Sequence, residues 1–172
     1  MSSNKRINQL KATLGHGARA NKYRVVMSIP KSSGSTEDID VLAKTATVPE
    51  RTVGVAPVWT QGRKISLAGD EAYSDSFDIE FYLLQDHSNR DIFNEWMNEV
   101  DNYNAHNRGS VAHEYMTTLE LSQLDTVNGD VLKTYKIMDV FPTTISELAF
   151  GSETNDEVSV FTVTFAFSSY SN

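Results

Sequence analysis

Asp78 and Glu80 are the first residues in this sequence whose types and spacing suggest chemistry. They stand two positions apart, so on a β-strand both carboxylates would lie on one face and could together bind a metal ion or transfer protons. No histidine or nucleophile stands at a matching spacing, and exposed strand faces are often acidic without having a catalytic role. We therefore expect this pair to belong to a solvated strand face.

The other chemically versatile residues form no recognisable site. The segment 125–130 (DTVNGD) resembles part of a calcium loop, but it lacks a third oxygen ligand and the closing glutamate, and a hairpin turn explains it better. The chain contains no nucleophile elbow, no P-loop and no dinucleotide-binding fingerprint. We expect no enzymatic activity, no metal and no cofactor. The histidines, which lack the spacing of a metal site, are His16, His87, His106 and His113.

The composition narrows the class of protein further. The 172 residues suit one domain with a sizeable core, and 40% of them are hydrophobic. The absence of cysteine excludes disulfides and thiolate chemistry. No apolar run is long enough to predict a transmembrane helix, and the basic N-terminus lacks the apolar segment of a secretory signal. Acidic residues outnumber basic ones by 23 to 15, which gives a net charge of −8 and argues against a surface that grips nucleic acid.

One strand and one helix stand out in the middle of the chain. Apolar and polar residues alternate from Ser76 to Leu83, which predicts a strand with one buried face. Apolar residues then recur at helical spacing from Ile92 to Val100, and Ser88 three residues before Asp91 predicts a helix that begins near Asn89. A second strongly alternating strand covers residues 158–167, and both of its faces are apolar or weakly polar. The predicted core residues are Phe77, Ile79, Phe81, Leu83, Phe93, Trp96, Met97, Phe161, Phe165 and Phe167.

Asn128-Gly129 is the strongest turn signal in the chain. It separates two alternating segments, residues 116–124 and residues 131–141, which we predict to form a β-hairpin. Pro142 is expected to end the second of these strands.

The register of this hairpin follows from the alternation. A two-residue loop would place Leu121 opposite Lys136 and so mix a core side chain with a charge. A three-residue loop, residues 127–129, places Leu121 opposite Tyr135 and Glu120 opposite Lys136. We predict this loop, with its glycine left-handed in a bulge.

The first half of the chain contains more turn- and loop-forming residues. Residues 1–21 are predicted to be an N-terminal arm, and residues 22–172 a single domain. Residues 23–29 and 38–47 are predicted strands. The segment 48–75 is mostly extended and contains prolines and glycines: we expect strands at residues 53–60 and 63–67, a turn at Gln61-Gly62 and a loop at residues 68–75. Long extended segments present unpaired backbone groups to other chains.

Three stretches, taken together and in order, resemble the tail tube proteins of contractile-tailed bacteriophages. The first, residues 17–29 (GARANKYRVVMSI), has an Ala-Arg-x-Asn element before a strand. The second, residues 62–100, contains the run Arg-Lys-Ile-x-x-Ala-Gly-Asp. The third, residues 135–170, has Phe-Pro-Thr and a C-terminal alternating strand. The resemblance extends over the whole chain and is weakest at residues 31–58 and 104–134.

This resemblance implies a mainly β (α+β) fold, a β-sandwich or barrel-like unit with one α-helix. Subunits of the family form hexameric rings, in which strands of neighbours join into one inner β-barrel, and the rings stack into a hollow tube. The implied partners are other copies of the chain, a sheath protein, a tape-measure protein, and baseplate and tail-terminator proteins. DNA would pass through the lumen without specific binding. The implied location is the virion tail, after synthesis in the host cytoplasm.

The resemblance and the residue pattern together suggest two surfaces. Polar residues on alternating strands could line the lumen, where their net negative charge would keep DNA from sticking. Exposed apolar and charged residues of the arm and of segment 48–75 could make contacts between subunits. The predicted lumen residues are Asp38, Asp40, Lys44, Thr118, Glu120, Ser122, Thr134 and Lys136. The predicted inter-subunit residues are Ile7, Leu10, Leu14, Val53, Val55, Trp59, Arg63, Lys64 and Asp70.

The sequence leaves other functions open. A baseplate tube initiator or the tube ring of a secretion system would have the same pattern. A soluble β-sandwich binding domain, for carbohydrate for example, would instead be a stable monomer with exposed aromatic residues clustered on one face.

Overall fold

Strand β7 (Val131–Ile145) is the longest strand, and the rest of the sheet is organised around it. In the computed structural model the described residues are 2–15, 17–30, 37–106, 114–148, 150–151 and 158–171. Within them β7 changes partner along its length: residues before Phe141 pair with β6, and those from Phe141 onward pair with β8. The elements are α1 (Ser2–Leu14), β1 (Tyr23–Met27), α2 (Glu37–Leu42), β2 (Ala43–Ala46), β3 (Arg51–Thr60), β4 (Arg63–Tyr73), β5 (Ser76–Tyr82), α3 (Ser88–His106), β6 (Thr117–Leu124), β7, β8 (Val160–Ala166) and β9 (Ser169–Ser171).

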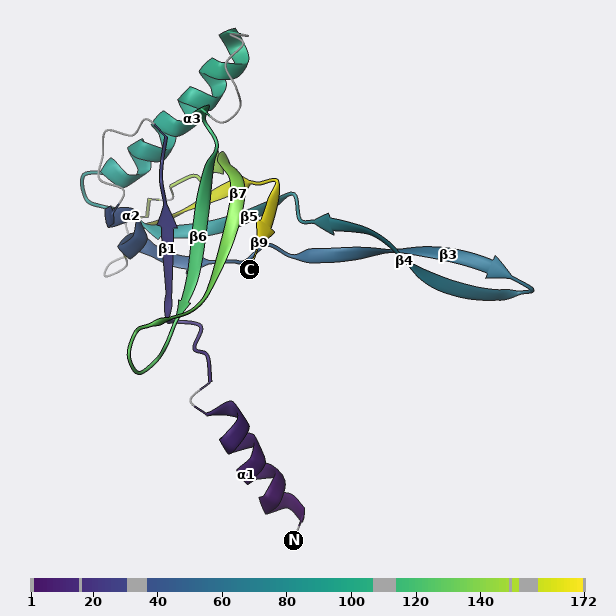
Figure 1. Cartoon of the computed structure of the whole chain (residues 1–172). Coiled ribbons are helices and arrows are strands. Elements are labelled where there is room, and N and C mark those ends of the chain that lie inside the picture. Colours follow the sequence, from purple (N-terminus) through teal and green to yellow (C-terminus); the bar gives the residue numbers. More distant parts are fainter. Residues whose placement is uncertain are drawn as a thin grey trace.

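These strands form one antiparallel sheet and one separate hairpin. The sheet has the order β1-β6-β7-β8-β5-β2, with β9 paired to the first part of β7, and β3 and β4 pair only with each other. Because β7 belongs to both halves, the sheet folds back on itself around a shared core, while the hairpin projects far to one side and α1 lies apart below (Figure 1). The predicted mainly β, α+β fold is confirmed, although the described residues contain three helices rather than one.

The change of partner explains why Pro142 does not end its strand. We predicted a strand end there, but β7 continues to Ile145 and Pro142 is paired opposite Phe165. The ladder is irregular just after Pro142, and Asp139, three residues before Pro142, has a φ of 58°. Proline lacks a ladder donor, and it is tolerated here because the strand bends and exchanges neighbours at this point.

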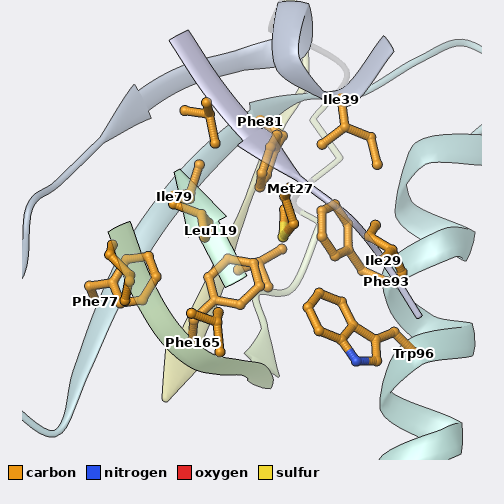
Figure 2. Close-up of a cluster of buried hydrophobic side chains, with 14 of the residues drawn as sticks. Met27, Ile29, Ile39, Phe77, Ile79, Phe81, Phe93, Trp96, Leu119 and Phe165 are labelled. Carbon is orange, nitrogen blue, oxygen red and sulfur yellow. The ribbon is translucent and has the colours of Figure 1, made fainter. Parts of the chain in front are cut away.

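The core lies between the two halves of the sheet and is closed on one side by α3. Phe93 and Trp96 reach from α3 into the cluster, toward Phe81 and Phe165 (Figure 2). The ring centroids of Phe81 and Phe93 are 5.0 Å apart, and the indole nitrogen of Trp96 donates to the Tyr115 carbonyl at 2.7 Å. Among the predicted core residues, Leu83, Met97 and Phe167 are half-buried, and the other seven are buried.

The start of α3 depends on side chains that periodicity did not identify. The helix begins at Ser88, one residue from the predicted position, but its cap is Asp86, which accepts hydrogen bonds from the backbone and the hydroxyl of Ser88. These bonds lower the pKa of the Asp86 carboxyl. The buried Asn89 accepts from Leu84 N at 3.2 Å and donates to the Tyr82 carbonyl at 2.7 Å, which fixes α3 to the end of β5.

The predicted strand at residues 38–47 is half wrong, because its first part is the short helix α2. The helix buries Ile39 while leaving Val41 82% exposed, so the two residues do not share a face. It also lets Asp40 Oδ1 accept the backbone N–H of Val25 at 3.0 Å, on the side of β1 that has no neighbouring strand. A side chain that accepts a hydrogen bond from an otherwise unpaired N–H at a sheet edge can outweigh the preference of its own segment for a strand.

The second error lies in segment 48–75. The predicted loop at residues 68–75 is for the most part strand, because β4 continues to Tyr73 and pairs with β3 as far as Arg51. The turn at Gln61-Gly62 is confirmed, and both residues have positive φ, which is the geometry of a type I′ hairpin turn.

The register predicted for the β6–β7 hairpin is confirmed, but the loop is not the predicted one. Leu121 pairs with Tyr135, and Glu120 pairs with Lys136. The extra residue is Leu132, which bulges from β7, because Gln123 pairs with Lys133 and Leu124 with Val131.

The loop itself occupies residues 125–130, longer than predicted. The Asp125 carboxylate accepts hydrogen bonds from the backbone N–H groups of the three residues that follow it, and Gly129 is left-handed as predicted, with φ 74°. The carboxylate therefore stabilises its own turn, which agrees with a turn rather than a calcium loop.

Candidate assembly surfaces

A stripe of paired polar side chains crosses the outward face of β6 and β7. Glu120 and Lys136 form an ion pair at 2.7 Å, and the hydroxyls of Ser122 and Thr134 hydrogen-bond at 2.8 Å. Ser122 was predicted to face the lumen, but it is only 6% exposed, so Thr134, which is half-buried, is the more accessible member of this pair. These pairs are cross-strand neighbours in the ladder, so the strand alternation brings them together. Thr118 lies on the same face, two residues before Glu120, and is exposed.

Arg24 extends this stripe to the edge of the sheet. It pairs with Ser122 across the β1–β6 ladder, and its guanidinium lies 3.4 Å from the Asp40 carboxylate. Asp40 therefore joins the stripe through a residue that the sequence analysis missed. The side chain of Asp38, another predicted lumen residue, lies outside the described residues.

Lys44 lies across an open groove from this stripe. The groove, of about 800 Å³, runs between β1 and β2, and its lining includes Arg24, Asp40 and Lys44. No backbone ladder closes the gap between these two strands; the hydroxyl of Tyr23 donates to the Ala43 carbonyl at 2.9 Å across it. Lys44 pairs with Glu80 at 3.2 Å, so each lysine among the predicted lumen residues is bound to a carboxylate.

The β3–β4 hairpin is exposed along nearly the whole of both strands. Every residue of β3 is exposed, and only Gly69 and Tyr73 of β4 are half-buried. Trp59 is 70% exposed near the tip, and the predicted contact residues Val53 and Val55 are exposed as well. The three charged contact residues of this segment, Arg63, Lys64 and Asp70, are also exposed.

The base of the hairpin is held by aromatic and ionic contacts. The Tyr73 ring packs edge-on against Tyr170 at 5.3 Å and Phe167 at 6.3 Å. Arg51 and Glu71 form an ion pair at 2.6 Å. A hydrogen bond from the Tyr73 hydroxyl, together with Arg51, lowers the pKa of the Glu71 carboxyl, and the same bond raises the pKa of Tyr73. These contacts at the base of the hairpin therefore fix the direction in which it projects from the sheet.

Helix α1 presents the other uncovered apolar residues of the predicted contact set. Ile7, Leu10 and Leu14 are exposed on a 13-residue helix that lies apart from the sheet (Figure 1). An isolated helix of this length is marginal in water.

The residues considered first for chemistry have structural roles. Glu80 pairs with Lys44, and Asp78 accepts a hydrogen bond from the Thr164 hydroxyl at 2.7 Å. His87 lies at the start of α3 with φ 59°. Within the described residues, no group of three or more histidine or acidic residues could hold a metal ion, and no helix is long and apolar enough to cross a membrane. His16 and His113 lie outside the described residues, as does the side chain of His106.

Comparison with known proteins gives consistent matches. A family model described as phage tail tube protein matches residues 18–172. The chain is 26% identical over 152 residues to tail tube protein gp19 of Enterobacteria phage T4, covering 88% of this chain and 90% of that protein. It is 23% identical over 162 residues to the tail tube protein of Serratia phage KSP90, covering 91% and 90%.

Two solved structures share the fold. One is a chain of the sheath–tube complex of the extracellular contractile injection system PVC in its extended state, with a TM-score of 0.65, 12% identity, and coverage of 95% of this chain and 94% of that one. The other is a chain of the six-fold symmetrised baseplate of the anti-feeding prophage, with a TM-score of 0.65, 11% identity, and coverage of 90% and 93%.

Proposed function

Because the chain belongs to the phage tail tube protein family, we propose that six copies form a ring and that the rings stack into the hollow inner tube of a contractile tail. The chain is a structural tail protein of a contractile-tailed phage. In our proposal phage DNA passes through the lumen into the host without being bound specifically.

The observation that carries this proposal is the β3–β4 hairpin. Its two strands pair with each other on both sides of one irregularity and are anchored at the base by Tyr73, yet all other apolar side chains of the hairpin are exposed. Monomeric soluble proteins rarely expose such continuous apolar surface, and when they do it commonly marks an interaction site. A stacked tube supplies neighbouring copies that can cover the hairpin, and we propose segment 48–75 as an inter-subunit segment on this basis.

The polar stripe on β6 and β7 is the proposed lumen wall. Six copies at −8 each would give a ring a charge of −48. Lys136 and Lys44 are neutralised by the carboxylates beside them, so they offer no free cation to a passing phosphate backbone. A wall of hydroxyls and paired charges would let DNA slide instead of binding it.

The proposed partners follow from the tube. The solved structures with this fold come from a sheath–tube complex and a baseplate, and we propose that this chain likewise meets a sheath, a baseplate and a terminator protein. A tape-measure protein would fill the lumen during assembly, and the chain would be made in the host cytoplasm. We propose residues 1–21 as an arm that contacts another copy, and residues 22–172 as the tube domain.

Electron microscopy of the purified protein tests this proposal. We expect six-fold rings or hollow tubes in negative stain. A stable monomer at high protein concentration would contradict the proposal and favour a soluble β-sandwich binding domain. Rings that never extend into long tubes would instead favour the second candidate, a baseplate tube initiator, whose expected fold is the same.

The position of the wall can be tested by cysteine labelling, because the chain contains no native cysteine. Thr118→Cys places a thiol on the proposed wall, and Asn94→Cys places one on the exposed side of α3. In assembled tubes we expect a bulky polyethylene-glycol maleimide to label position 118 much more slowly than position 94, while a small maleimide labels both. Equal labelling by the bulky reagent would rule out the β6–β7 face as the lumen.

Removal of residues 1–14 tests the arm. We expect the truncated protein to keep its fold and its rings but to form shorter tubes, because the exposed stripe on α1 would no longer contact a neighbour. Tubes of normal length from the truncated protein would show that the arm is not needed for stacking.

A further inference from the structure

The open edge of β1 is partly covered by one of the subunit's own side chains. Among the described residues, β1 pairs with β6 on one side and with no strand on the other. The carbonyl of Lys22 accepts the N–H of Leu124 at 2.9 Å, so every second residue from Lys22 onward turns its backbone groups toward β6. The N–H groups of Tyr23, Val25 and Met27 therefore point toward the open edge.

Asp40 occupies the middle one of these edge positions. Its Oδ1 accepts the N–H of Val25 at 3.0 Å, and its Oδ2 lies 3.4 Å from Nε of Arg24, the preceding residue of β1. The ion pair thus holds the carboxylate with its other oxygen aimed at the edge. A strand that added to β1 would need to place a carbonyl oxygen where Oδ1 lies. Asp40 and an added strand therefore compete for the same donor.

The helix that carries Asp40 is fixed at this edge. Ile39 of α2 is only 3% exposed and belongs to the same buried cluster as Met27 of β1 (Figure 2). Ala43, which directly follows α2, accepts a hydrogen bond from the hydroxyl of Tyr23 at 2.9 Å. The contact of Asp40 with β1 is therefore set by the packing of α2 and does not depend on a loosely placed surface side chain.

The covered edge belongs to the half of the sheet that carries the polar stripe. In this half β1 pairs with β6, β6 with the first part of β7, and that part of β7 with β9, so β1 and β9 are its two outer strands. In the proposed ring this half continues into the neighbouring subunits, so its edges must accept strands. An open edge before assembly would instead pair with whatever extended chain it met. The edge of β1 must therefore be closed in the free subunit and open in the ring.

We propose that Asp40 is a removable cap on β1. It satisfies the N–H of Val25 in the free subunit and blocks the addition of a strand, and the strand of a neighbouring copy displaces it when the ring forms. The displaced carboxylate keeps Arg24 as its ionic partner, so no charge is left unpaired. This inference rests on the proposed tube function and adds a control on when the subunit assembles.

Two substitutions at this position separate the cap from the charge. Asp40→Ala removes the acceptor, whereas Asp40→Asn, the matched control, removes the same charge but keeps an oxygen that can accept the N–H of Val25. The measurement is the critical concentration at which the purified full chain forms rings and tubes, by sedimentation and negative-stain microscopy. We expect Asp40→Ala to lower this concentration by at least about tenfold, because its subunits give up no charge-assisted hydrogen bond before they join. Asp40→Asn should lie closer to the wild-type value.

The direction of the change distinguishes a cap from an ordinary stabilising contact. If Asp40 served only to hold the subunit together, Asp40→Ala would weaken the subunit and raise the critical concentration. If both substitutions lowered the critical concentration equally, the cause would be reduced repulsion between acidic subunits. Either result would overturn the proposal.

Hydrogen exchange follows the cap directly. In unassembled protein, below the critical concentration, Asp40→Ala should lose protection at the Val25 amide and keep it at the Val26 amide, which points toward β6. In tubes, the Val25 amide should be equally protected in wild type and Asp40→Ala, because a neighbouring strand now supplies the acceptor. Faster exchange of Val25 in Asp40→Ala tubes would show that Asp40 remains bonded to β1 after assembly, and the cap would not be removable.

The outcomes also separate this inference from the proposed function. If neither the wild-type chain nor Asp40→Ala forms rings or tubes, the tube function is contradicted and the inference fails with it. If the wild-type chain assembles and Asp40→Ala has no lower critical concentration, the inference alone is wrong and the tube function stands. A lower critical concentration together with equal protection of Val25 in tubes supports both.

Discussion

Replacing Asn89 by alanine should destabilise the protein more than its position in the first turn of a helix would suggest. The side chain is buried and makes two hydrogen bonds to the backbone, accepting from Leu84 N and donating to the Tyr82 carbonyl. Tyr82 is the last residue of β5, and Leu84 lies between β5 and α3, so the two bonds tie the start of the helix to the end of the strand. Each lost bond should cost about 1–2 kcal/mol, so we expect the free energy of unfolding to fall by about 2–4 kcal/mol.

The assay is urea denaturation followed by circular dichroism, on wild-type and variant proteins at one fixed concentration, because assembly adds a concentration-dependent stabilisation. Asn94→Ala is the matched control: it makes the same change on the exposed side of the same helix, and alanine has the higher helix propensity, so stability should change by less than about 0.5 kcal/mol. If Asn89→Ala behaves like Asn94→Ala, the two hydrogen bonds do not hold α3 in place.

Two further outcomes follow from the contacts. Folding lowers the pKa of the Glu71 carboxyl from its ordinary value of 4.5. The ionised carboxylate therefore stabilises the hairpin base above pH 4.5, and this stabilisation is lost as the pH falls through the lower pKa of the folded protein. In acid, the amides at the hairpin base should lose protection from hydrogen exchange in the wild-type protein and should change less in Glu71→Gln. Trp96→Phe keeps an aromatic ring in the core but removes the donor to the Tyr115 carbonyl, so urea denaturation should show a loss of about 1–3 kcal/mol, and an unchanged midpoint would contradict that role.

The parts of the fold that were predictable from sequence are those in which alternation and turn chemistry agree. The inward residues of β5 and the register of β6 against β7 follow from one rule, that a buried face cannot accept a charge. Helix α2 was not predictable in the same way. Its residues alternate like a strand, but the burial of Ile39 and the hydrogen bond from Val25 to Asp40 depend on a strand that is distant in sequence.

The surfaces were harder to predict than the core, for a physical reason. The segment after Leu67 contains glycine and two adjacent acids, which is typical of a loop, yet it continues β4 because pairing with β3 satisfies its backbone. The members of the polar stripe were identified from their alternation. Arg24 was missed because its role depends on the neighbouring strand and on Asp40, neither of which is near it in sequence.

The exchange of partners by β7 has a mechanical consequence. A single continuous strand belongs to both halves of the sheet, and β9, which directly follows β8, pairs with the first part of β7; the two halves therefore cannot move apart without bending β7 or breaking the ladder bonds of β9. We therefore expect the two halves to open as one cooperative unit rather than sheet by sheet. A force applied to one half of the subunit would be transmitted to the other half along the backbone of β7. A tube wall made of such subunits would therefore resist separation of the two halves of each subunit.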